Sequence, residues 1–146
     1  MENHGRKVTC SLIKRPNEQQ CLEIISLYRS QGWWQARDDR QKALLHRLIS
    51  GSHAFVVAER EGAVVGIGRA ISDGVSDAYI QDLTVNPSFR RQGIGKAILK
   101  TLLKQLIDDG ISWIGLIAEP GSAELYQSFD FTEMSGSIPM LMVRKS

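Results

Sequence analysis

Residues 90–96 combine two glycines with three cationic side chains, directly before a segment with a helical pattern. Gly93 and Gly95 have no Cβ atom, so an anion can come close to the backbone there. The first turn of a helix also presents unpaired N–H groups and about half a positive charge. These features predict a binding site for a diphosphate group. By themselves, the two glycines also fit an ordinary tight turn between a strand and a helix.

Two common phosphate motifs do not fit this segment. A P-loop requires a glycine five residues before Gly95 and a hydroxyl residue after Lys96, and the chain has neither. A dinucleotide fingerprint requires a third glycine at a position where this chain has Ile98. An earlier pair, Gly66 and Gly68, fails in the same way and falls inside a predicted strand. Both motifs are therefore set aside.

The candidate site depends on the elements before and after it. Residues 78–85 predict a strand that runs into the loop. Residues 92–109 carry an apolar stripe that repeats every four residues, and Gly110 stands where a glycine often follows a helix. The stripe consists of Ile94, Ile98, Leu102 and Leu106. A strand, a glycine loop and a helix N-terminus in this order are the parts that an anion site requires.

The other segments predict an α/β domain with a mixed central sheet flanked by helices. Helices are expected from 16–18 onward, from 38–39 to Gly51, and over 120–128. Strands are expected at 8–14, 54–59, 63–71, 111–117, 129–134 and 139–144. The helix over 92–109 then forms one parallel crossover. A chain of 146 residues with 42% hydrophobic content fits one domain that spans residues 1–146.

The composition argues against several partners. A net charge of +2 gives no reason to expect nucleic acid or an acidic membrane surface, and no apolar run is long enough for a membrane span. The polar first residues lack a secretory signal, which predicts a cytoplasmic protein. Three histidines without a metal-binding spacing predict no metal site. Cys10 and Cys21 are expected to be free thiols, although a single bridge between them is arithmetically allowed.

Arg90-x-x-Gly93-x-Gly95 resembles the (Gln/Arg)-x-x-Gly-x-(Gly/Ala) signature of the Gcn5-related N-acetyltransferase (GNAT) superfamily. The preceding strand, the Val85-x-Pro87 turn and the following amphipathic helix are similar to that family in order, and the resemblance covers residues 54–131. It implies the acyl-CoA N-acyltransferase fold, with acetyl-CoA as cosubstrate and no metal. The residues that would bind the cosubstrate are Leu83, Thr84, Val85, Arg90, Arg91, Gln92, Gly93, Ile94, Gly95 and Lys96.

The resemblance also implies how these residues bind. The amides of 90–96 would hold the diphosphate of coenzyme A. The backbone of Leu83 and Val85 would pair with the pantetheine arm, which lies against the sheet like an added strand. Because main-chain groups supply the hydrogen bonds, the side chains there can be plain aliphatics.

Residues 122–131 resemble a second family element, usually aromatic-Tyr-x-x-(Leu/Phe)-Gly-Phe. Tyr126 falls on the tyrosine that donates a proton to the leaving thiolate in many members. A phenol with a pKa of about 10 can do so without being charged at neutral pH. The alternative is a buried aromatic with a satisfied hydroxyl. Asp130 stands where the family has glycine, and aspartate tolerates the left-handed conformation that such a turn needs.

The general base is left open. Some members of the family that the chain resembles place a Glu or a pair of His residues on the face of this strand that looks into the acceptor cleft. By alternation those positions are Tyr79 and Gln81 here, and neither is a base at neutral pH. They could relay a water. Asp82 would face the other way unless a β-bulge redirects it, and Glu119 after the next strand is a further candidate.

Acceptor binding in this superfamily usually involves the first two helices and the loop between them, where this chain has Trp33, Trp34 and Arg37. The two tryptophans predict either a cover for the core or a pocket for an aromatic amine. The favoured function is transfer of an acetyl group to a primary amine of a small molecule by direct attack on the thioester. A CoA-binding regulatory module without efficient turnover and a peptide or protein N-acetyltransferase are the alternatives, and a homodimer is common among the proteins that the chain resembles.

Overall fold

The computed structural model describes residues 7–35 and 39–144, which form two compact units divided after Leu116. Arg37, expected near the acceptor, lies outside the described residues. Within the described ranges, no helix is both long and apolar enough to cross a membrane.

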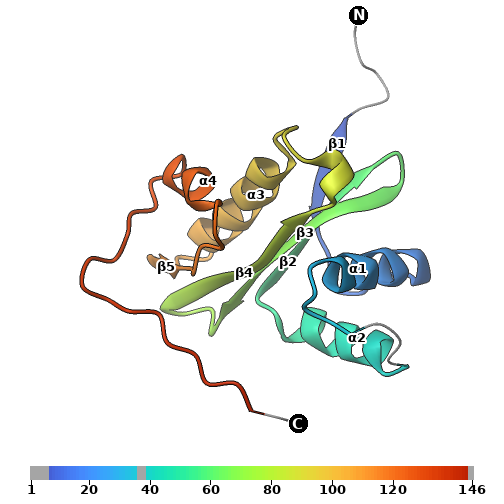
Figure 1. The fold of residues 1–146 in the computed structure, drawn as a ribbon, viewed down its shortest axis with the longest axis horizontal. Coiled ribbons are helices and arrows are strands. Elements are labelled where there is room, and N and C mark those ends of the chain that lie inside the picture. Colours follow the sequence, from blue (N-terminus) through green and yellow to red (C-terminus); the bar gives the residue numbers. More distant parts are fainter. Residues whose placement is uncertain (1–6, 36–38, 145–146) are drawn as a thin grey trace, which may run out of the picture. The chain divides into compact units, whose positions relative to one another are not determined.

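A five-stranded mixed sheet forms the centre of the first unit, as predicted (Figure 1). Its strands follow one another in chain order, and all neighbours are antiparallel except the last pair, which is parallel. The strands are β1 (Val8–Leu12), β2 (Ala54–Arg60), β3 (Ala63–Ser72), β4 (Asp77–Val85) and β5 (Trp113–Gly115). The last strand is shorter than the predicted 111–117.

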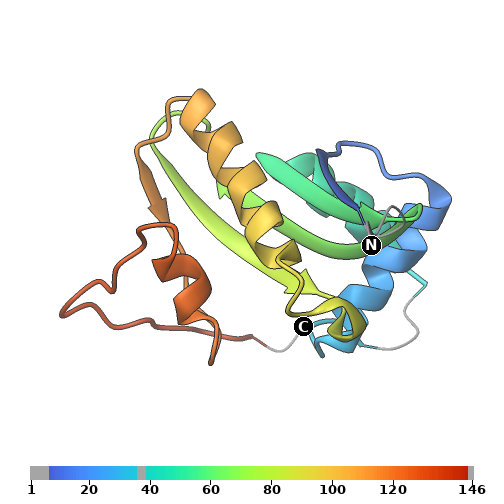
Figure 2. The same ribbon diagram turned by 90° about the horizontal axis from the view of Figure 1, so that it is seen from above.

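Helices cover both faces of this sheet. Helices α1 (Glu18–Ser30) and α2 (Gln41–Gly51) lie on one face, and α3 (Ile94–Asp108) crosses the other (Figures 1 and 2). Helix α1 begins with a capping box, in which Asn17 and Gln20 each accept the other's backbone N–H, at 2.8 and 3.0 Å. Such a box satisfies two of the unpaired donors of a helix start. The core on this face includes Ile24, Tyr28, Leu45, Phe55 and Ile67.

Two glycines of β3 bring α3 close to the sheet. A Cβ atom at Gly66 would lie 2.8 Å from Ile98 Cδ1, and one at Gly68 would lie 2.7 Å from Ile98 Cγ2. Real Cβ atoms do not approach that closely, so a larger residue at either position would force Ile98 or its surroundings to shift. The Gly66-x-Gly68 pair therefore allows α3 to pack closely on β3.

The second unit contains one helix, α4 (Ala123–Gln127), in its described residues. After it the Phe131 N–H donates to the Tyr126 carbonyl at 3.2 Å, and Asp130 has a φ of +69°, which confirms the left-handed turn expected there. The predicted strands 129–134 and 139–144 are wrong, because neither range is a strand in the structure. A strand requires a neighbour for its backbone groups, and side-chain pattern alone cannot provide one. The apolar side chains from Met140 to Val143 are 78–88% exposed.

Candidate active site

The predicted anion loop joins β4 to α3 through a short 3₁₀ turn, η1 (Pro87–Phe89). The Asn86 N–H donates to the Val65 carbonyl at 2.8 Å, and the Asn86 side chain accepts the Ser88 N–H at 2.9 Å. The chain then takes left-handed φ values of +63° at Arg91 and +79° at Gly93. These two bends turn the loop into the first turn of α3.

The backbone amides of this loop are free to bind a ligand. Gly93 is the N-cap of α3 and has no side chain to cap the helix. Among the described residues, none accepts a hydrogen bond from the N–H groups of residues 91–96. Free N–H groups at a helix N-terminus donate hydrogen bonds to an anion, and the helix dipole attracts its negative charge. The geometry expected for a diphosphate site is therefore present in one continuous segment.

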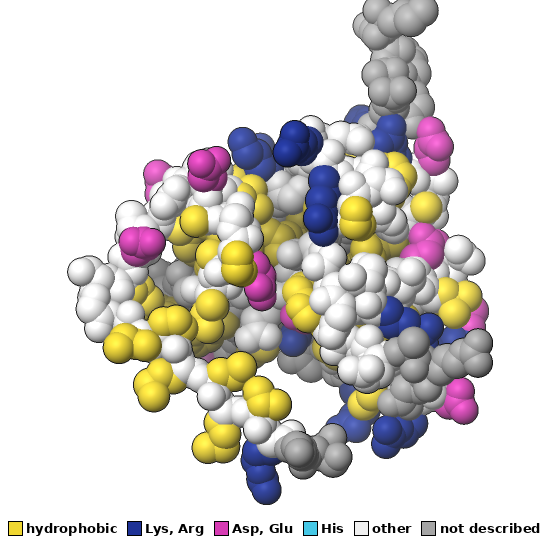
Figure 3. Space-filling view, viewed as in Figure 1, with side chains coloured by type: hydrophobic (Ala, Val, Ile, Leu, Met, Phe, Trp, Pro, Cys, Tyr) yellow, Lys and Arg dark blue, Asp and Glu magenta, His cyan; other side chains and the backbone are white. Residues whose placement is uncertain are grey.

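Cationic side chains surround the same loop. Arg90, Arg91 and Lys96 are exposed, and the Arg90 Nε–H donates to the Val85 carbonyl at 3.3 Å. In the space-filling view, Lys and Arg side chains (dark blue) gather over the part of this face where α3 begins (Figure 3). Exposed cations around free amides raise the local concentration of anions.

Arg60, which the sequence analysis did not single out, contacts the loop from the end of β2. Its Nη1 donates to the Gln92 side-chain oxygen at 2.8 Å, and its guanidinium lies 5.2 Å from the centre of the Phe89 ring. The two partners are about thirty residues away along the chain, so no local motif could have indicated the contact. The hairpin of β2 and β3 brings Arg60 there.

One edge of β4 is open beside the loop. Strand β3 pairs with β4 along its length, whereas β5 pairs only with residues from Asp77 to Tyr79. From Ile80 to Val85, the other edge of β4 has no strand partner in the described chain. The backbone of Leu83, Thr84 and Val85 lies in this stretch, so an extended ligand could pair with it as an added strand.

A β-bulge interrupts β4 and redirects Asp82. Asp82 and Leu83 together oppose Gly68, and Asp82 has a φ of +58°. Instead of facing α3, the Asp82 carboxylate accepts the Arg69 Nε–H at 2.6 Å and the Tyr28 hydroxyl at 2.8 Å. The bulge considered from the sequence is thus confirmed. Because two strong donors already hold the carboxylate, Asp82 is better suited to fixing the bulge than to accepting a proton from a substrate.

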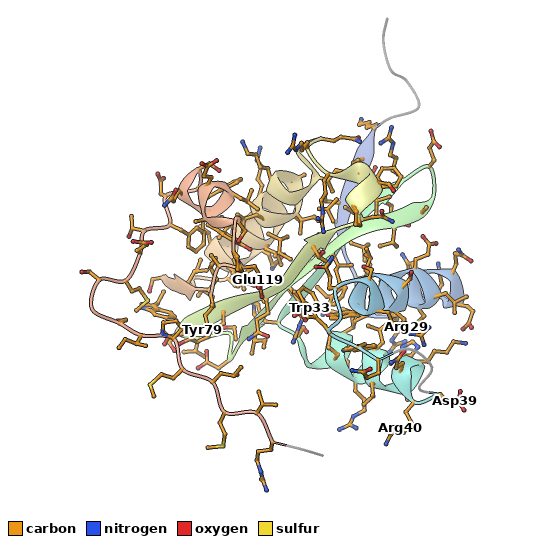
Figure 4. All side chains as sticks on the ribbon, in the orientation of Figure 1. Arg29, Trp33, Asp39, Arg40, Tyr79 and Glu119 are labelled. Atoms are coloured by element: carbon orange, nitrogen blue, oxygen red, sulfur yellow. The ribbon has the colours of Figure 1, made fainter. Side chains whose placement is uncertain are left out.

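Tyr79 and Gln81 lie before this bulge and are both exposed. The Tyr79 ring packs edge-on against Trp113 with centroids 5.2 Å apart, and the Gln81 side-chain oxygen accepts an Arg69 N–H at 3.3 Å. Figure 4 labels Tyr79 on β4 and Trp33 after α1. Neither predicted position carries a base.

The two tryptophans expected near an acceptor pack on Tyr28. Trp34 stacks on the Tyr28 ring at 4.6 Å, and Trp33 lies 6.0 Å from it at a tilt. Burial, and then the Asp82 carboxylate, raise the pKa of Tyr28 well above its ordinary value, so the hydroxyl stays a donor. Trp34 is half-buried, which agrees with a cover for the core, whereas Trp33 is 39% exposed. A pocket for an aromatic amine stays a prediction.

A cavity of about 200 Å³ lies beside the two tryptophans. Its polar wall includes the buried Gln41, which accepts the Arg29 Nε–H at 2.8 Å and donates to the Gln35 carbonyl at 2.6 Å. The cavity is lined by Trp33, Trp34, Gln35, Gln41 and Leu44. Among the described residues, its lining is uncharged and includes two aromatic side chains.

Tyr126 belongs to the second unit. It is buried, and its ring packs edge-on against Phe131 at 5.9 Å. Burial, and then the Glu119 carboxylate, raise the pKa of Tyr126, so its phenol is protonated at neutral pH, as a proton donor must be. The role of Tyr126 in proton transfer stays a prediction, as does that of Glu119.

Within the described residues, no cluster of His, Cys, Asp and Glu could hold a metal ion. Cys10 and Cys21 are both free thiols, and the Cys21 sulfur lies 3.6 Å from His46 Nε2. The single bridge that the sequence allowed is therefore not formed.

Comparison with known proteins decides the family. The family model described as an acetyltransferase (GNAT) domain matches residues 17–139. The chain belongs to the GNAT acetyltransferase family. The resemblance drawn from the loop is thereby confirmed, and the match starts well before residue 54, so it includes the two N-terminal helices of this GNAT chain.

Curated relatives and solved structures agree with this assignment. GCN5-related N-acetyltransferase 1, chloroplastic, from Arabidopsis thaliana is 36% identical over 92 residues, which are 62% of this chain and 47% of that protein. An uncharacterized ycf52-like N-acetyltransferase from Prochlorococcus marinus is 29% identical over 76% of this chain and 62% of its own length. The GNAT chain thus spans about half to three-fifths of these relatives. A GNAT family acetyltransferase from Streptococcus pneumoniae superposes with a TM-score of 0.76 at 26% identity, covering 96% of this chain and all of that one.

Proposed function

We propose that this GNAT chain is an N-acetyltransferase that moves an acetyl group from acetyl-CoA to a primary amine of a small molecule. The observation that carries the proposal is the row of free N–H groups at residues 91–96, next to the open edge of β4. Both features lie in the first unit. Acetyl-CoA is the donor typical of the family, and it contains a diphosphate and an extended amide arm.

The donor would use these two features in turn. Its diphosphate would accept hydrogen bonds from the amides of 91–96, with Arg90, Arg91 and Lys96 adding positive charge. Its pantetheine amides would pair with the β4 backbone near Leu83 and Val85, as in β-strand addition. This arrangement leads the thioester along β4 toward the bulge.

Transfer would then occur by direct attack. The amine nitrogen bonds to the thioester carbonyl carbon, the carbon–sulfur bond breaks, and the nitrogen loses a proton to a base. Holding both reactants together supplies several kcal/mol of the rate acceleration. The bulge leaves the Leu83 N–H outside the β3 ladder, where it could stabilise the developing oxyanion. Tyr126 would protonate the leaving thiolate, so no covalent enzyme intermediate is needed.

The base in this proposal is a water held by Tyr79 and Gln81, or Glu119. The first option is supported by the exposure of both side chains on β4. Asp82 is assigned a positioning role, because Arg69 and Tyr28 occupy its carboxylate.

A small amine is supported by the size of the cavity beside Trp33 and Trp34. Among the relatives, serotonin N-acetyltransferase 2, chloroplastic, from Oryza sativa is 32% identical over 63% of this chain and 48% of that protein. A protein acceptor remains the alternative, since histone acetyltransferase TAP1 from Glycine max is 35% identical over 61% of this chain. A regulatory module that binds CoA without turnover is the other alternative. A homodimer and a cytoplasmic location stay predictions from the sequence.

An amine panel tests the proposal. Release of free thiol from acetyl-CoA would be followed with aromatic amines, polyamines, aminoglycosides and lysine-containing peptides. We expect turnover with at least one small amine, and slower turnover with peptides. Binding of acetyl-CoA without thiol release for any acceptor would favour the regulatory module, and turnover restricted to peptides would favour a protein acetyltransferase.

A further inference from the structure

We infer that Arg60 is a positioning residue that holds the donor loop from the end of β2, an inference that rests on the proposed function. Its guanidinium makes two contacts with segments on either side of Arg90. It donates to the Gln92 side chain at 2.8 Å and lies over the Phe89 ring at 5.2 Å. One planar group therefore contacts both η1 and the loop that carries the free amides.

The loop has few other restraints. Arg91 and Gly93 flank Gln92, and both have left-handed φ values. No side chain caps α3, and the Arg90 N–H reaches the Pro87 carbonyl only at 3.4 Å. In the described parts of the chain, the side chains of residues 91–93 make one hydrogen bond to another element, and its donor is Arg60. Removing this bond should let the loop sample conformations in which its amides no longer converge.

Arg60 itself is well anchored. Its backbone pairs with Val8 on one side and Ala63 on the other. Among the described residues, the Arg60 guanidinium forms no ion pair with a carboxylate. The Phe89 ring, in contrast, borders a cavity of about 440 Å³ between α1, β3 and η1, so it has room to move once the guanidinium is gone.

Arginine suits this task better than lysine. A guanidinium is planar, so it can stack on a ring and donate in its own plane at the same time. The stacked cation and the hydrogen bond from a charged group both help to hold the loop in one conformation. We therefore expect the Arg60 contacts to change donor affinity by about tenfold.

The test compares two donors in steady-state kinetics of Arg60→Ala, Gln92→Ala and the double variant. S-acetylpantetheine lacks the diphosphate, so it does not need the loop. We expect each single variant to raise the KM of acetyl-CoA about tenfold with kcat within about twofold of wild type. The KM of S-acetylpantetheine should stay unchanged. The double variant should be no worse than Arg60→Ala, because Arg60→Ala already removes the hydrogen bond that Gln92→Ala removes.

Two further variants separate the effect of the planar Arg60 side chain from the effect of its charge. Arg60→Lys keeps the charge but loses the planar group, and we expect it to resemble Arg60→Ala. Arg47→Ala removes an exposed cation on α2 and should leave both KM values unchanged. An unchanged acetyl-CoA KM in Arg60→Ala, additive effects in the double variant, or wild-type behaviour of Arg60→Lys would overturn the positioning role. So would an equal rise in KM for both donors, which is the result expected from general destabilisation.

The inference and the proposed function fail in different ways. If the wild-type protein does not bind acetyl-CoA, the donor site itself is wrong. If a loop variant such as Gly93→Glu loses acetyl-CoA while Arg60→Ala retains it, only the Arg60 role is wrong. Should Arg60→Ala not fold, as judged by circular dichroism, Gln92→Ala tests the same contact from the exposed loop side.

Discussion

At the residue scale, the donor loop depends on backbone conformations that few residues adopt. Gly93 has a φ of +79°, whereas Gly95 lies inside α3 and has no positive φ. The two glycines of the motif thus have different tasks. Gly93 allows the bend, whereas Gly95 has a helical backbone that alanine can also adopt.

Gly93→Glu should raise the KM of acetyl-CoA by more than about tenfold. The carboxylate repels the diphosphate, and the left-handed backbone adds a strain of roughly 1 kcal/mol for a residue with a Cβ. Nothing lies within 4 Å of a Cβ at this position, so the effect is not a clash.

Two controls separate these causes. Gly93→Ala introduces the strain without the charge, so its KM for acetyl-CoA should lie between those of the wild type and Gly93→Glu. Gly95→Ala should keep donor binding and gain up to about 1 kcal/mol of stability, because alanine favours a helix and the family pattern permits it. Normal acetyl-CoA affinity in a folded Gly93→Glu variant would refute the assignment of the site.

Tyr126→Phe should lower kcat by about tenfold or more and leave the KM of acetyl-CoA nearly unchanged. A proton donor must be protonated, so its activity is lost only as the pH rises through its pKa. Burial and Glu119 raise that pKa above the ordinary value of about 10, so no loss due to Tyr126 is expected below about pH 9. Rates measured from pH 6 to 10 check both points. Equal kcat values would mean that Tyr126 is a core aromatic.

At the scale of elements, the bulge in β4 is held by side chains from β3 and α1. Arg69 and Tyr28 both donate to Asp82, whose side chain is only 20% exposed. Helix α1 thereby connects the tryptophan pair to the strand along which the donor would lie. The same bulge takes Leu83 out of the ladder with β3.

Asp82→Asn should reduce the free energy of unfolding by about 2 kcal/mol, since it replaces two hydrogen bonds to a charged group. It should also lower kcat, because the bulge sets the position of the Leu83 N–H. Tyr28→Phe removes one donor and keeps the ring stack with Trp34, so it should cost about 1 kcal/mol and change kcat less. Urea unfolding and initial rates measure these effects. A stable Asp82→Asn variant with full activity would show that the bulge does not depend on this carboxylate.

At the scale of the whole molecule, the sequence predicted what depends on local pattern. The stripe from Ile94 to Leu106 indicated α3, and the structure has this helix. The glycines of the loop indicated an anion site, which stays a prediction, although the amides of residues 91–96 have no acceptor among the described residues. Contacts between distant segments were not predictable. Arg60 on β2 contacts Gln92 in the loop, which is far away in the sequence. The prediction of closing strands was wrong because residues 139–144 pair with no other strand in the described chain. Asp82 was weighed as a candidate, but its donors Tyr28 and Arg69 come from other elements.

A crystal structure with bound coenzyme A tests the central claim most directly. We expect the diphosphate oxygens to lie about 2.7–3.2 Å from several backbone nitrogens of residues 91–96, with the pantetheine arm along the open edge of β4. Coenzyme A bound elsewhere on the chain, with those nitrogens facing only solvent, would contradict the account.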